Sequence, residues 1–178
     1  MPSLVASGAL IRELRKDEFH TYSDLFVNLD PESRRNRFCG ALSDSCVAEH
    51  TRRAWDTNVA IFGYFVSAEL RGVSELHPFD LRDTAEAVFA VHQGFRRRGI
   101  GTALLHVTML AAQRHGYRTI TIACLRHNFA MRRLAQKVGA KLMLTLDEIE
   151  GEITVSQGLR DTPTHLSLLD ARPRDRAG

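Results

Sequence analysis

The sequence predicts an α+β fold in which a central mixed, mostly antiparallel sheet of about seven strands carries helices on both faces. The first observation behind this prediction is the spacing of apolar residues, which changes repeatedly between the period of two typical of strands and the longer period typical of helices. The second is the order of the segments: strand, three helices, three strands, helix, strand, helix and two strands. Consecutive strands favour hairpins, whereas helices between strands permit parallel crossovers. The length of 178 residues suits one domain.

The N-terminal part of the chain has the pattern of one strand followed by three helices. Apolar residues recur at helical spacing from Asp17 until Asp30 and Pro31 interrupt them. Asp30 suits an N-cap and Pro31 the first position of a new helix, because that position needs no backbone N–H. We predict a strand over residues 8–14 and helices that begin at Asp17, at Pro31 and after Ser43. Ser43 or Asp44 caps the third helix, which reaches about Ala54.

The remainder of the chain alternates between strands and helices. We predict strands over residues 58–67, 69–77, 85–92, 118–125, 141–146 and 151–157, and helices over residues 100–115 and 128–138. The last residues include few apolar side chains to bury, so we expect residues 161–178 to form a mobile tail. The folded unit is then a single domain over residues 1–160.

Composition and charge are those of an ordinary globular protein. Hydrophobic residues make up 44% and charged residues 25%, and no apolar run approaches the ~20 residues that a membrane helix needs. The net charge of +3 suits anionic ligands without requiring nucleic acid. Cys39, Cys46 and Cys124 are odd in number and lack metal-site spacing, which favours reduced cytoplasmic thiols. We expect a cytoplasmic monomer or homodimer that binds no metal, nucleic acid or membrane.

Residues 91–105 carry the clearest indication of a ligand. An apolar run ends near Gly94, three arginines follow at 96–98, and Gly99 and Gly101 lie where a helix begins. Glycine has no Cβ, so a ligand can approach the backbone closely there. The N–H groups of the first helical turn and the positive end of the helix dipole attract anions, and arginines add charged donors. The segment therefore predicts a pyrophosphate site.

Two common nucleotide motifs do not fit this spacing. A P-loop requires Lys and Ser/Thr directly after its second glycine, but Ile100 and Gly101 follow Gly99. A dinucleotide fingerprint that began at Gly99 would need a small residue at Leu104. The pattern that does fit is Arg-x-x-Gly-x-Gly, formed by Arg96, Gly99 and Gly101.

This pattern resembles the acetyl-CoA signature of the GNAT N-acetyltransferase superfamily. A second block strengthens the resemblance, because Asn128, Met131 and Leu134 match the family's Asn-x-x-(Ala/Met)-x-x-Leu helix. The resemblance covers roughly residues 8–158 and implies a GNAT-like fold in which the fourth and fifth strands splay apart to hold the pantetheine arm of acetyl-CoA. The cofactor-binding residues that it implies are Phe89, Ala90, Val91, Phe95, Arg96, Arg97, Arg98, Gly99, Ile100, Gly101, Thr102, Asn128 and Met131.

Glu86 is the candidate catalytic residue. Both faces of the strand 84–91 are apolar apart from this glutamate, so the strand should be central and the carboxylate at least partly buried. Burial raises the pKa of a glutamate toward the range useful to a general base, and an alkylammonium must lose a proton before it attacks a thioester. In GNAT enzymes related to the bacterial protein-lysine acetyltransferases, a glutamate in this strand is that base, and Glu86 matches its position. The resemblance also implies that the backbone of residues 89–91 holds the thioester carbonyl.

Alternatives to these assignments stay open. Glu86 could lie at the wet end of its strand, paired with an arginine, and Glu69, Glu75 or Asp83 could then be the base. Asn128 could act as a helix N-cap, a role compatible with a ligand contact.

One departure and one further similarity concern the branch of the family. Many members have a Tyr that protonates the leaving thiolate directly after the Leu of the second block, but here Leu134 is followed by Ala135. The protein-lysine acetyltransferase branch often lacks this Tyr as well. Residues 31–39 resemble the Pro-Glu-Ser-Arg-x-x-Arg-Phe-Phe segment of that branch, with Cys in place of the second Phe. The alternative is an amphipathic helix whose Arg34 and Arg37 face water.

Together these patterns predict an acetyl-CoA-dependent N-acetyltransferase that acetylates a primary amine by direct attack in a ternary complex, with Glu86 as base. A protein lysine is the first expected acceptor, and a polyamine or another small amine is the second. Two other functions remain alternatives: a non-catalytic acetyl-CoA-binding regulatory domain, and nucleic-acid binding through the arginine-rich turn. The modest net charge argues against nucleic acid.

Overall fold

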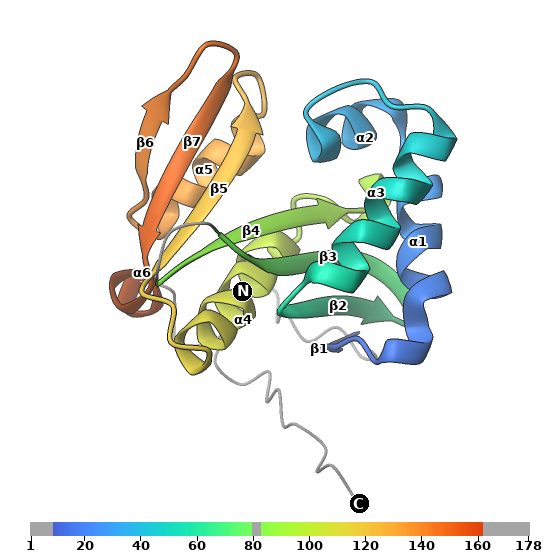
Figure 1. Ribbon diagram of the computed structural model, residues 1–178, viewed down its shortest axis with the longest axis horizontal. Coiled ribbons are helices and arrows are strands. Elements are labelled where there is room, and N and C mark those ends of the chain that lie inside the picture. The colour runs from blue at the N-terminus through green and yellow to red at the C-terminus, as the bar shows by residue number, and fades with distance from the viewer. Residues whose placement is uncertain (1–8, 80–82, 162–178) are drawn as a thin grey trace, which may run out of the picture.

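The computed structural model describes residues 9–79 and 83–161, which form a seven-stranded sheet in the order β1-β2-β3-β4-β5-β7-β6 (Figure 1). Neighbouring strands are antiparallel except β4 and β5, which are parallel. The predicted mixed, mostly antiparallel sheet is therefore confirmed. The strands are β1 (Ala9–Glu13), β2 (Ala60–Val66), β3 (Glu69–Pro78), β4 (Thr84–Val91), β5 (Thr119–Leu125), β6 (Lys141–Leu144) and β7 (Glu148–Thr154).

Helices α2 and α3 begin where the sequence predicts. The backbone N–H of Ser33 donates to the side chain of Asp30 (2.9 Å), and that of Cys46 donates to the Ser43 hydroxyl (3.3 Å), so both N-caps are formed. In the part of the chain that is described, no helix combines the length and the apolar character needed to cross a membrane. The helices are α1 (Phe19–Val27), α2 (Pro31–Phe38), α3 (Asp44–Thr57), α4 (Ile100–Arg114), α5 (Phe129–Lys137) and α6 (Val155–Asp161).

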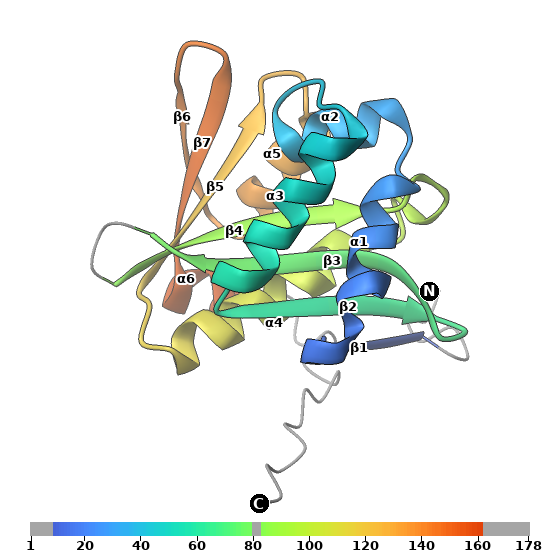
Figure 2. The same cartoon turned by 45° about the vertical axis from the view of Figure 1, so that its right-hand side comes forward.

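Two apolar cores lie on opposite faces of the sheet. Figure 2 shows helix α4 on one face and helices α1 and α3 on the other. Alternate residues of a strand point to opposite faces of a sheet. Accordingly, Ala87 of β4 packs in the core between the sheet and α4, whereas Ala90 packs in the core between the sheet and helices α1 and α3. Helix α4 is apolar around most of its circumference, which explains why it is buried along almost its whole length. Helices thus cover both faces, as predicted.

The end of the domain differs from the prediction. Residues 155–157 were predicted to continue a strand, and this is wrong, because β7 begins earlier, at Glu148, and ends at Thr154, after which α6 follows. Gly158 explains the difference, since a Cβ at that position would lie 2.6 Å from Sδ of Met109 in α4. The glycine therefore permits a close approach of α6 to α4, a tertiary contact that outweighs the local apolar alternation. The predicted tail beyond Asp161 lies outside the described residues.

Candidate active site

Strands β4 and β5 pair over only a short stretch and then diverge (Figure 1). Their parallel register runs from Thr84 with Thr119 to Glu86 with Thr121. Beyond Glu86, β4 continues to pair with β3, and β5 continues to pair with β7. The splay that the sequence resemblance implied is therefore present, and it opens the sheet on the C-terminal side of Glu86.

The divergence leaves one edge of β4 without a strand partner among the described residues. The N–H of His92 donates to the carbonyl of Arg71 in β3 (2.9 Å), and in an antiparallel pair such bonded positions alternate along the strand. By this alternation the backbone groups of Ala87, Phe89 and Val91 point away from β3, toward the space between β4 and β5. Ala90 differs, because its backbone groups face β3 and its side chain is buried, so its position does not favour the predicted cofactor contact.

The N-terminus of α4 continues from this edge. Gly99 precedes the helix in the left-handed conformation (φ 82°) and contributes no capping side chain. The first intrahelical hydrogen bond runs from the N–H of Ala103 to the carbonyl of Gly99 (3.1 Å), so the N–H groups of Ile100, Gly101 and Thr102 precede the helical ladder. Free donors at the positive end of a fifteen-residue helix form an anion-binding arrangement.

Arg96 has a different environment from the one expected of a phosphate ligand. Its Nη2 lies 3.4 Å from a carboxylate oxygen of Asp30 and donates to the hydroxyl of Ser33. The side-chain carbonyl of Gln93 also accepts the backbone N–H of Asp30 (3.3 Å). Arg96 therefore connects the glycine turn to the N-terminus of α2, an interaction that joins residues more than sixty positions apart and that no local pattern indicates.

The other two arginines of the turn remain exposed. Arg97 has a positive φ of 60°, and the guanidinium of Arg98 lies over the ring of Phe95 at 5.0 Å from its centroid. Arg71 of β3 approaches the same ring at 5.0 Å. Phe95 thus holds two cations close to the turn. Arg71 is also paired with Glu69, whereas Arg98 contributes positive potential beside the open helix terminus.

Helix α5 borders the same site. The side chain of Asn128 accepts the backbone N–H of Met131 (3.1 Å), so Asn128 is the N-cap of α5, one of its two compatible roles. Leu134 lies against the first turn of α4, where its Cδ2 would be 3.4 Å from a Cβ on Gly101. Ala135, where many relatives have Tyr, is fully buried.

Gly101→Ala should separate ligand binding from stability. The new Cβ would meet only an ordinary van der Waals contact with Leu134, and alanine favours the helix over glycine by roughly 0.5–1 kcal/mol. If a pyrophosphate contacts this backbone, the same methyl group displaces it, and losing one charged hydrogen bond weakens CoA binding by about 10- to 100-fold. We therefore expect a higher melting temperature together with a weaker CoA affinity by calorimetry. Gly40→Ala, whose Cβ would also find room, is the matched control; unchanged CoA affinity in Gly101→Ala would contradict the assignment.

Glu86 is half-buried on the face of β4 that also carries Ala90, toward α1 and α2. Its cross-strand partner in β3 is His77. The guanidinium of Arg37 in α2 also interacts with Glu86. Burial lowers the pKa of Arg37, but nearby negative charges, including that of Glu86, raise it overall. The predicted base therefore lies on the strand that diverges from β5, at the point where the divergence begins.

Glu75 is the other carboxylate on this face, and it is fully buried. Its two oxygens accept Nη2 of Arg37 (2.9 and 2.8 Å), and it also contacts the hydroxyl of Tyr22 (3.0 Å) and Nε2 of His77 (2.9 Å). Burial alone raises its pKa, but the charge of Arg37 and the hydrogen bonds from His77 and Arg37 lower it to about 2. Such a carboxylate does not accept a proton at neutral pH, which argues against Glu75 as the base.

The remaining alternatives are less suited. The side chains of Glu69 and Asp83 are 64% and 60% exposed and are paired with Arg71 and Arg118. Arg37 and Arg34, by contrast, are only 11% and 18% exposed, so the interpretation of α2 as a helix whose Arg34 and Arg37 simply face water is wrong for both residues. The sequence pattern indicated that residues 31–39 are of interest, but it did not predict the pairing of Arg37 with Glu75. The only indication of this pair in the sequence was a charged residue, Glu75, within the apolar segment that forms β3.

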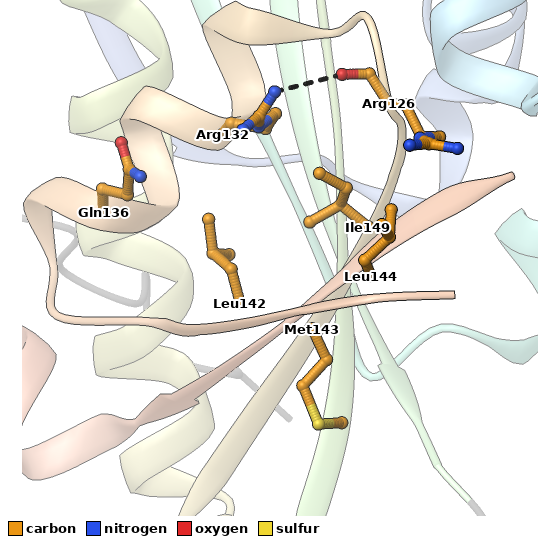
Figure 3. A pocket seen from close by; sticks show the side chains of 7 residues that line it. All are labelled: Arg126, Arg132, Gln136, Leu142, Met143, Leu144 and Ile149. Atoms are coloured by element: carbon orange, nitrogen blue, oxygen red, sulfur yellow. Dashed lines mark hydrogen bonds between the residues drawn. The ribbon is translucent and has the colours of Figure 1, made fainter. Parts of the chain in front are cut away.

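A separate pocket of about 360 Å³ lies between α5 and the hairpin of β6 and β7 (Figure 3). None of the predicted site residues lines it. Arg132 donates to the carbonyl of Arg126 at its rim (3.3 Å). Its lining residues are Arg126, Arg132, Gln136, Leu142, Met143, Leu144 and Ile149. In the described ranges, no group of three or more His, Cys, Asp or Glu side chains is arranged to hold a metal ion.

Comparison with known proteins identifies the family. The family model of the acetyltransferase (GNAT) family matches residues 9–140. The chain belongs to this family. Its fold is similar to that of the GNAT domain of S. lividans PAT, with 18% identity over 81% of this chain and 89% of that one and a TM-score of 0.68. GNAT membership makes the protein an N-acetyltransferase and agrees with the turn before α4 and with the second block in α5.

Two further structures of this fold contain the expected ligand. The paiA N-acetyltransferase of Thermoplasma acidophilum, in complex with coenzyme A, is 17% identical over 83% of this chain and 99% of that one, with a TM-score of 0.64. The yncA structure from Salmonella typhimurium, with acetyl-CoA, is 17% identical over 84% of this chain and 95% of that one, with a TM-score of 0.61. At these identities the likeness shows that the GNAT fold is shared.

Proposed function

We propose that this GNAT protein transfers the acetyl group of acetyl-CoA to a primary amine, with a protein lysine as the leading acceptor. The observation that carries the proposal is the continuous backbone surface formed by the unpaired edge of β4 and the open N-terminus of α4. Two structures of the same fold with CoA or acetyl-CoA support the choice of co-substrate.

The residues present fit such a ligand. The pantetheine arm contains amides that can pair with the backbone groups of Phe89 and Val91, as an additional strand would. The pyrophosphate suits the N–H groups of residues 100–102, and Arg97 and Arg98 add positive charge beside them. Leu134 of α5 lies against Gly101 in the first turn of α4, and we propose that Asn128 and Met131, at the start of the same helix, complete the site.

Glu86 acts as the general base in this proposal. The acceptor arrives as an ammonium and attacks only after it loses a proton, which Glu86 takes up directly or through one water. The backbone N–H of Phe89 or Val91 stabilises the negative charge that develops on the thioester oxygen. Attack takes place in a ternary complex, because both ligands meet where β4 leaves β5.

The leaving thiolate has no phenolic acid to protonate it at position 135, where the side chain is a buried alanine. A thiol pKa is much lower than that of an amine, so the thiolate departs without a dedicated acid and takes its proton from water. The absence of a Tyr at this position is a feature that the protein-lysine acetyltransferase branch often shares.

The protein-lysine acceptor rests on two similarities. Residues 31–39 resemble a segment of the protein-lysine acetyltransferase branch, and they form α2, whose Arg37 reaches the face of Glu86. The fold is similar to that of the S. lividans PAT domain. A polyamine or another small amine is the second candidate acceptor.

Thiol release from acetyl-CoA, measured across polyamines, amino acids and folded acyl-CoA synthetases, distinguishes these acceptors. We expect the fastest release with a protein acceptor and an acetylated lysine in its peptide map. Fastest release with a polyamine would overturn the protein-lysine assignment. Tight CoA binding without release in any mixture would instead indicate a non-catalytic regulatory domain.

A further inference from the structure

His77 lies beside the proposed base, and the mechanism above gives it no part. It is the cross-strand partner of Glu86, and directly opposite residues of an antiparallel pair project to the same face with Cβ atoms about 4.5–5.5 Å apart. A carboxylate and an imidazole at such positions can exchange a proton directly or through one water. His77 is therefore within reach of the proton that Glu86 takes up.

Glu75 fixes the orientation of this imidazole. Nε2 of His77 lies 2.9 Å from Oε2 of Glu75. The carboxylate of Glu75 is held ionised by Arg37 and by its hydrogen bonds, so it can only accept. The neutral imidazole must then carry its proton on Nε2, which leaves the lone pair on Nδ1. A carboxylate that fixes the tautomer of a basic imidazole is also the arrangement of the Ser-His-Asp triad.

Charged and polar groups from several elements surround this imidazole. Glu75 on its own strand and Glu86 on β4 are negative, and Arg37 from α2 is positive. Tyr22 from α1 contributes a neutral hydroxyl, because burial and the charge of Glu75 raise its pKa. The imidazole is also 13% exposed, which gives it contact with water.

We propose that His77 receives the proton that Glu86 removes from the acceptor amine, an inference that rests on the proposed function. The N–H bond of the ammonium breaks and an O–H bond forms at Glu86. This O–H bond then breaks as an N–H bond forms at Nδ1 of His77, which restores the carboxylate of Glu86. The imidazolium, held between Glu75 and Glu86, finally releases the proton to water. His77 thus acts through Glu86, and Glu75 positions it.

The variant that tests this role is His77→Gln, because its amide can still donate to Glu75 but has no basic nitrogen. The probe is acetyl-CoA with the amine that gives the fastest thiol release. We expect kcat to fall at least tenfold, within the range typical of lost proton transfer. We also expect added imidazole buffer to restore part of the rate, because a free base replaces Nδ1. The double variant that combines Glu86→Gln with His77→Gln should be no slower than Glu86→Gln alone, because Glu86 and His77 act on the same proton.

A purely structural His77 predicts different results. Unchanged kcat in His77→Gln, or a loss that buffer does not restore and that adds to the loss in Glu86→Gln, would overturn the relay while leaving the proposed function intact. If Glu86→Gln itself has no effect, the base assignment and the relay both fail. If no amine accelerates thiol release, the proposed function fails with them. A nitrogen-15 spectrum of the wild-type protein needs no substrate: the neutral imidazole of His77, identified by its absence in His77→Gln, should carry its proton on Nε2. A proton on Nδ1 would contradict the inference.

Discussion

Replacing Glu86 with Gln lowers turnover by on the order of 10²–10⁴-fold, the range typical of a lost general base, while the affinity for CoA stays near that of the wild type. Gln has nearly the shape of Glu but cannot accept a proton, so the acceptor must lose its proton to water. Glu86 lies on the face of β4 toward α1 and α2, whereas the proposed CoA contacts use the backbone edge of β4 and the terminus of α4. Glu86→Gln should therefore change turnover without changing the affinity for CoA.

Glu69→Gln is the matched control, because Glu69 is exposed and lies at the opposite end of β3 from His77. We expect it to retain wild-type turnover. Thiol release measured under single-turnover conditions with saturating acetyl-CoA isolates the chemical step. Equal rates for Glu86→Gln and the wild type would remove the base assignment, and a large loss of CoA affinity would show that Glu86 contributes to ligand binding instead.

Glu75→Gln has the largest expected effect on stability. The substitution removes the negative charge that compensates Arg37, which is 11% exposed and whose other neighbours include the ring of Phe38. Leaving one member of a buried ion pair without its partner costs about 3–5 kcal/mol of unfolding free energy. For a protein of this length that loss lowers the melting temperature by roughly 6–20 °C. Fluorescence of Trp55, the single Trp of the chain, reports the transition.

A second substitution and the pH dependence of stability test whether the unpaired charge of Arg37 causes this loss. Adding Arg37→Met to Glu75→Gln removes the uncompensated charge, so the double variant should be more stable than Glu75→Gln alone. In the wild type the pKa of Glu75 lies at about 2, below its ordinary value of 4.5. Its contribution is therefore complete above pH 4.5 and is lost as the pH falls toward 2, because the unfolded chain then binds the proton first. The stability gap between wild type and Glu75→Gln should narrow over that interval; a constant gap would contradict the account.

Features that depend on neighbouring residues could be predicted from the sequence. Asp30 and Ser43 cap the helices expected of them, and Gly99 adopts the left-handed conformation at an open helix terminus. A cap or a glycine turn involves only a few consecutive residues, so its pattern is visible in the chain. For the same reason the glycine turn was enough to predict the start of α4.

Features that depend on distant contacts could not be predicted. Arg37 and Glu75 are 38 positions apart, and apolar periodicity does not tell which charged side chains meet. Arg96 was expected at a phosphate, yet it joins Asp30 and Ser33 at the start of α2. Helix α6 replaces part of a predicted strand because Gly158 fits against Met109. In each case the three-dimensional neighbour decides the role of the residue.

The measurement that tests the central claim most directly is thiol release from acetyl-CoA with and without a primary amine, coupled to mass spectrometry of the amine. The proposed function predicts release that depends on the amine, rises with its concentration and matches the amount of acetylated product. CoA binding by calorimetry with thiol release that no amine accelerates would contradict it, and the unpaired edge of β4 and the open terminus of α4 would then serve ligand binding alone.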